Sequence, residues 1–83
     1  MTATVFEVEQ AGCVSCAARV RGALAPLAAV DGIEIDEDKD TATVRLAPGT
    51  DATEVDVNRA LLEASHGSGH VYRVKPGSWH LEP

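Results

Sequence analysis

The sequence predicts a small α+β domain in which two helices cover one face of a four-stranded antiparallel sheet. Three observations lead to this prediction. Within 83 residues, short segments alternate apolar with polar residues, as half-buried strands do. Two other segments carry apolar residues three or four positions apart, as amphipathic helices do. The segments follow the order strand, helix, strand, strand, helix, strand.

The first strand and the first helix meet at the two cysteines of the chain. Residues 2–9 alternate in the pattern of a strand, and Cys13 and Cys16 follow shortly after it. Apolar residues then recur every four positions from Cys16 to Leu24, which indicates a helix beginning two residues after Cys13. Pro26 disfavours helical geometry at the residue before it, so we expect regular helix to end there or after one looser turn. This places Cys13 on a loop and Cys16 in the first helical turn.

The second half of the chain repeats the alternation of strands and helix. Residues 30–36 and 41–46 alternate on either side of a polar turn, which predicts a hairpin. Asp51 or Thr53 is a suitable cap for a second helix. The inner face of that helix is expected to carry Val57, Ala60, Leu61 and Ala64. A loop with two glycines precedes a last strand at 71–74, which completes a ferredoxin-like βαββαβ sandwich.

The domain is expected to span residues 1–74. Residues 75–83 contain Pro76, Gly77 and Pro83 and read as a loosely held tail. Trp79 is the one candidate anchor for this tail.

The composition is that of a water-soluble protein with an acidic surface. Apolar residues make up 45% and charged residues 24%, and the net charge is −6. Residues 31–40 carry six carboxylates against Lys39, which argues against nucleic acid as a partner. The polar turn at 37–40 could instead steer the chain toward a basic partner, or simply be solvated. We find neither a signal peptide nor a membrane-inserting segment, and we expect a cytoplasmic protein.

The motif and its surroundings resemble the heavy-metal-associated domain family over residues 3–74. The residues that carry the resemblance are Cys13-x-x-Cys16, Val20, Leu24, Val30 and Ile35-Asp36. This family includes soluble copper chaperones, mercury-binding periplasmic proteins and the amino-terminal domains of metal-pumping P-type ATPases. The resemblance implies that the chain is copper chaperone-like, with Cys13 and Cys16 as metal ligands. It also implies transfer to a CxxC-containing domain of a P-type metal ATPase or another acceptor, by a monomer or a metal-bridged dimer.

Two departures from the family pattern lie next to the expected metal site. Gln10, Ala11 and Gly12 stand where the family usually has Gly-Met-Thr or Gly-Met-Ser. The family's Met packs beneath the loop, so Ala11 leaves a volume that other side chains must fill. After the second helix, Ser65-His66 replaces the Gly-Tyr of many bacterial chaperones.

The two cysteines are suited to soft-metal binding or to redox chemistry. The positive end of a helix dipole favours thiolates at this position. Cu(I) accepts two thiolates on an exposed loop, whereas Zn(II) normally takes four ligands and is the second choice. Three alternatives remain. The chain could be a sensor or docking module, a domain that has lost metal binding and keeps the two cysteines as small buried residues, or a thiol–disulfide oxidoreductase. The sequence offers no nucleophile, base and orienting group in combination, so it does not predict an enzyme.

His66 is a candidate third metal ligand. In this topology the loop after the second helix lies at the same end as the loop after the first strand. His66 could therefore add a nitrogen to the two sulfurs, with His70 as a weaker candidate. The alternative is a solvated loop histidine.

Overall fold

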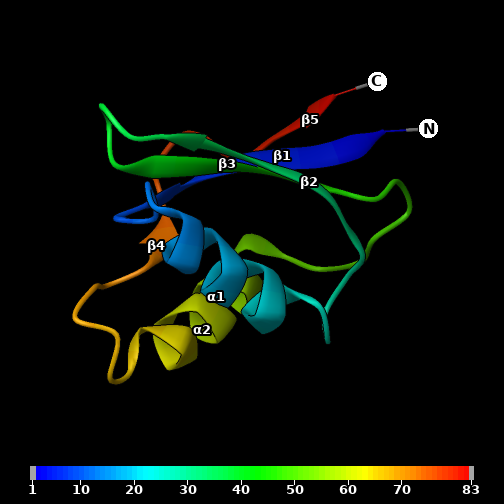
Figure 1. Cartoon of the computed structure of the whole chain (residues 1–83). Coiled ribbons are helices and arrows are strands. Elements are labelled where there is room, and N and C mark those ends of the chain that lie inside the picture. Colours follow the sequence, from blue (N-terminus) through cyan, green and yellow to red (C-terminus); the bar gives the residue numbers. More distant parts are fainter. Residues whose placement is uncertain (1, 83) are drawn as a thin grey trace.

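The computed structural model describes residues 2–82 and confirms a sandwich of one sheet and two helices (Figure 1). The elements are β1 (Ala3–Glu9), α1 (Val14–Leu24), β2 (Val30–Asp36), β3 (Thr41–Leu46), α2 (Glu54–Ser65), β4 (Arg73–Val74) and β5 (His80–Glu82). Both helices lie on the same face of the sheet. Within residues 2–82, neither helix has the length and apolar character needed to cross a bilayer.

The sheet places alternate side chains against the helices. Its strand order is β2-β3-β1-β4, every pairing is antiparallel, and β5 also pairs with β1. Phe6 lies opposite Val44, and Val8 lies opposite Ala42, so these apolar residues share the helix-covered face. They form a buried core with residues of α1, α2 and β4, among them Val20, Leu24, Val57, Leu61 and Val74.

The helix ends follow the predicted signals. Regular α1 ends at Leu24, whose carbonyl then accepts hydrogen bonds from the N–H groups of Leu27 and Ala28, so one looser turn follows. Helix α2 is capped by Thr53, not Asp51. The Thr53 hydroxyl accepts from the Asp56 N–H, and the Asp56 carboxylate accepts from the Thr53 N–H.

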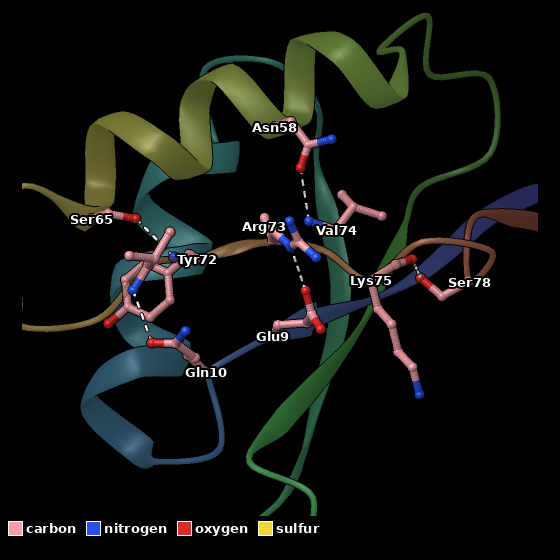
Figure 2. Close-up of polar contacts among 10 residues, drawn as sticks. Glu9, Gln10, Asn58, Ser65, Tyr72, Arg73, Val74, Lys75 and Ser78 are labelled. Carbon is pink, nitrogen blue, oxygen red and sulfur yellow. Dashed lines mark hydrogen bonds and ion pairs between the residues drawn. The ribbon is translucent and has the colours of Figure 1, made fainter.

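The short strand β4 and the residues before it are held by side chains from two other parts of the chain, the loop after β1 and helix α2 (Figure 2). The N–H donors of Val71, Tyr72 and Val74 bond to Gln10 Oε1, Ser65 Oγ and Asn58 Oδ1, at 3.1, 2.8 and 2.8 Å. These bonds satisfy donors that a longer sheet pairing would otherwise satisfy. They also hold the Tyr72 side chain in the core, where it is 1% exposed.

The expectation of a loosely held tail after residue 74 is wrong. Residues 80–82 form β5, which pairs with Ala3–Val5 of β1. Trp79 stacks on Phe6 with ring centroids 5.0 Å apart, so it does anchor this segment. A turn at residues 75–78 separates β4 from β5, and both strands lie along the same edge of β1. Pro76 and Gly77 therefore interrupt the edge strand without ending it.

Charged side chains on the face of the sheet away from the helices help to hold β5 in place. Both ring nitrogens of His80 face acceptors, the Ser78 carbonyl at 2.6 Å and the Glu82 carboxylate at 3.1 Å. The hydrogen bond to Ser78, followed by that to Glu82, raises the pKa of His80 above its ordinary 6.5. Arg45 also pairs with Glu82, and the hydrogen bonds from Arg45 and then His80 lower the pKa of Glu82 below 4.5.

We predict that this cluster stabilises the fold most between about pH 4.5 and 6.5. The contribution of His80 is fully present below its ordinary pKa and fades as the pH rises through the raised value. The contribution of Glu82 is present above its ordinary pKa and fades as the pH falls through the lowered value. The thermal midpoint of wild type minus that of His80→Gln should therefore be larger at about pH 5.5 than at about pH 8. An identical difference at both pH values would contradict the prediction.

Candidate metal site

The structure confirms that the two cysteines lie at the junction of β1 and α1. After β1 ends at Glu9, Gln10 adopts a left-handed conformation with φ of 59°, which turns the chain toward the helices. Cys13 is the N-cap of α1, and its Sγ accepts a hydrogen bond from the Cys16 N–H at 3.2 Å. The Cys13 carbonyl accepts from the Ala17 N–H at 2.9 Å and begins the helix. Helix α1 starts at Val14, one residue earlier than predicted.

The turn between β2 and β3 supports the loop that precedes Cys13. The Ala11 N–H donates to the backbone carbonyl of Asp40 at 3.2 Å. The Gly12 N–H donates to Asp40 Oδ1 at 3.1 Å. A Cβ atom on Gly12 would lie 2.6 Å from the Cα of Asp40, so the approach requires glycine. These contacts place the acidic turn at the cysteine end of the domain.

The two sulfurs differ in exposure and are joined in a disulfide. Cys13 is half-buried, whereas Cys16 is 2% exposed and belongs to the core. Cys16 lies in the first turn of α1 as predicted, but it is buried, whereas binding of Cu(I) by two thiolates led us to expect both sulfurs to be exposed. The cause is its place in the helix: Cys16, Val20 and Leu24 follow one another at four-residue spacing and share the buried face of α1.

The surroundings of Cys13 favour a negatively charged sulfur once the disulfide is reduced. The sulfur lies at the positive end of the α1 dipole, and α1 has no acidic residue in its first turn. Ser15 Oγ lies 3.4 Å from Cys13 Sγ and can donate a hydrogen bond to it. The first turn of α1 therefore supplies a backbone donor and a hydroxyl donor to the same sulfur.

The structure does not join the candidate histidines to the cysteine pair. His66 is the exposed C-cap of α2, and His70 stacks on Tyr72 with centroids 5.8 Å apart. Among residues 2–82, no group of three or more His, Cys, Asp or Glu side chains is placed to hold a metal ion. His66 as a third ligand therefore stays a prediction.

The sequence analysis did not predict a role for two residues beside this site. Asp40 holds the loop, yet in the sequence it is one acid among several in a polar turn. Tyr72 is buried in the same core cluster as Ala11 and Cys16, and its hydroxyl has no hydrogen-bond partner. The signal for the first was Gly12, because a glycine beside a motif can mark a close backbone approach.

A family comparison agrees with this geometry. The heavy-metal-associated domain profile matches residues 5–70, with both cysteines inside the match. The chain belongs to the heavy-metal-associated domain family. Cys13 and Cys16 occupy the usual motif position of this family of soft-metal-binding domains. The chain is therefore a member of a family of heavy-metal-binding domains.

Two solved structures share the family fold with this chain. One is oxidized MerP from Ralstonia metallidurans CH34, with 15% identity and a TM-score of 0.56, covering 88% of this chain and 97% of that one. The other is described as "Crosstalk between Cu(I) and Zn(II) homeostasis", with 23% identity and a TM-score of 0.53, covering 90% of this chain and 99% of that one. No curated protein matches significantly.

We predict that Gly12→Ala destabilises the domain by about 1–3 kcal/mol, because the new methyl group collides with the Asp40 backbone. Urea unfolding of the oxidised chain measures this. Gly22→Ala is the matched control, since a Cβ there has no heavy atom within 4 Å and alanine favours the α1 helix. Equal stability of Gly12→Ala and wild type would show that the Asp40 backbone does not approach Gly12 this closely.

Proposed function

We propose that the reduced chain binds Cu(I) between Cys13 and Cys16 and passes it to an acceptor protein. The observation that carries this proposal is the position of the two sulfurs, side by side at the start of α1 with Cys13 half-exposed. Cu(I) is a soft ion that is satisfied by two thiolates. Zn(II) is the second choice, because two thiolates supply only half of its usual ligand set.

Metal binding requires the disulfide to be reduced first. A dithiol reductant transfers two electrons to the Cys13–Cys16 bond and becomes a disulfide itself, and two protons convert the released sulfurs to thiols. The metal ion then displaces these protons as the thiolates coordinate it. A cytoplasmic location, where thiols are kept reduced, suits this requirement.

Transfer is proposed to proceed by exchange of one sulfur ligand at a time. An incoming thiolate meets the metal on the side of Cys13, because Cys16 is enclosed by the core. A three-coordinate intermediate follows, and release from Cys13 precedes release from Cys16. The proposed acceptor is a CxxC-containing domain of a P-type metal ATPase or another metal acceptor. The chain acts as a monomer or as a metal-bridged dimer.

The acidic turn offers a means of orienting such an acceptor. Glu37 and Asp38 are exposed in the same turn from which Asp40 contacts the cysteine loop. Opposite charge on an acceptor would raise the rate of encounter with its CxxC motif near Cys13. The interaction weakens as salt is added, because exposed charges are screened.

Thiol–disulfide exchange is a second candidate, favoured by the disulfide itself. An oxidoreductase reduces a test disulfide at a rate that depends on both cysteines. A sensor or docking module instead changes its affinity for a protein partner when metal binds. A carrier hands Cu(I) to an acceptor with little change in its own fold.

We predict that the reduced chain competes with a chromogenic chelator for Cu(I), and that Cys13→Ser/Cys16→Ser does not. Anaerobic titration at about pH 7 measures the amount of metal withdrawn from the chelator. The double variant removes both thiolates while keeping the side chains similar in size. If wild type and variant lose to the chelator equally, the metal-binding proposal fails.

A second prediction concerns His66 as a nitrogen ligand. His66→Ala should bind Cu(I) more weakly than wild type at neutral pH in the same competition assay. His80→Ala is the control, because His80 lies in β5, which pairs with the amino-terminal part of β1. Equal affinities for all three proteins would leave Cys13 and Cys16 as the complete ligand set.

A further inference from the structure

A groove of about 620 Å³ with several charged residues in its lining opens beside the cysteine loop. Its walls come from the end of β1, the turn before β3, and the segment around β4. Besides Gln10, its lining includes Glu9, Lys39, Asp40, Thr41, Arg73 and Lys75. Figure 2 shows Arg73 turned toward Glu9, and the Lys75 side chain extending away from α2. Small-molecule sites in proteins have volumes of this order.

The groove concentrates positive charge on an acidic protein. It holds three of the seven Lys and Arg residues of a chain whose net charge is −6. Among residues 2–82, neither Lys39 nor Lys75 takes part in an ion pair. Arg73 donates to Glu9 through Nε at 2.5 Å, which leaves its terminal nitrogens free of that bond. The two ammonium groups are therefore open to an anion.

The two carboxylates of the lining are already engaged. Glu9 pairs with Arg73, and Asp40 Oδ1 accepts a hydrogen bond from the Gly12 N–H. The ion pair with Arg73 offsets the charge of Glu9, whereas Asp40 keeps its charge, so the lining carries three positive and two negative groups. Charge in the groove thus favours an anion over a cation.

Thr41 supplies an independent observation. This residue is 6% exposed and lines the groove, yet its hydroxyl has no hydrogen-bond partner. A buried hydroxyl without a partner carries a free-energy cost. An acceptor oxygen entering beside Thr41 would remove this cost, and a small shift of the covering side chains would give it access.

We propose that this groove binds a small oxyanion, carried by a carboxylate- or phosphate-bearing molecule. Lys39 and Lys75 contact its negative charge, and Thr41 and Arg73 donate hydrogen bonds to its oxygens. Asp40 lines the groove and also accepts a hydrogen bond from the Gly12 N–H, so an anion in the groove changes the environment of the Gly12 amide. The site is separate from the sulfurs and does not require bound metal.

Amide NMR of the oxidised, metal-free chain tests the proposal directly. Inorganic phosphate and succinate are titrated separately at about pH 7, with sodium chloride keeping the ionic strength constant. The expected result is saturable shifts at Gln10, Thr41 and Arg73, together with Gly12, and dissociation constants of about millimolar order. Saturation by succinate alone identifies a carboxylate ligand, by phosphate alone a phosphate ligand, and by both a general oxyanion site.

Two double variants make the test specific. Lys39→Gln/Lys75→Gln should weaken binding about tenfold, since each exposed charge contributes up to about fivefold. Arg21→Gln/Arg59→Gln removes the same charge from exposed positions on α1 and α2, and should bind as wild type does. Shifts that sodium chloride reproduces, or equal affinities of the two double variants, would overturn the proposal. Because metal is absent throughout, this result is independent of the copper proposal.

Discussion

The approach of the β2–β3 turn to the cysteine loop sets the geometry of this end of the domain. The Asp40 carbonyl accepts a hydrogen bond from the Ala11 N–H, and the Asp40 carboxylate accepts one from the Gly12 N–H, 28 residues earlier in the sequence. The contact is possible because Gly12 has no side chain to separate the two backbones. It fixes the residues just before Cys13, and with them the direction in which α1 begins. The N-cap hydrogen bond between Cys13 Sγ and the Cys16 N–H depends on that direction.

The order and type of the elements could be predicted because they depend on local pattern. Alternation in residues 2–9 and four-residue spacing from Cys16 to Leu24 each report which side of an element is buried. The stop signals also act locally, as Pro26 does after α1 and the glycines do after α2. The position of the CxxC motif at a strand-to-helix junction followed from these patterns alone, and it is confirmed.

Two features that sequence reasoning missed, strand β5 and the role of Asp40, depend on partners far along the chain. Pro76 and Gly77 look like the start of a free tail. However, β4 pairs only with the end of β1, and β5 pairs with the remaining part of the same edge. Trp79 reinforces this pairing by stacking on Phe6, a contact that no local pattern encodes. The special role of Asp40 among several neighbouring acids depends in the same way on where the cysteine loop returns in space.

The unequal burial of the two sulfurs would give the proposed metal transfer a defined order. Cys16 shares the inner face of α1 with Val20 and Leu24, so moving its sulfur outward would disturb the packed core. Cys13 lies on the half-exposed N-cap, where exchange of a ligand disturbs only the loop. In the proposed transfer, the anchored sulfur retains the ion while the outer sulfur is replaced, so the ion is never free in solution. Two equally exposed sulfurs would hold the same ion without imposing this order on its release.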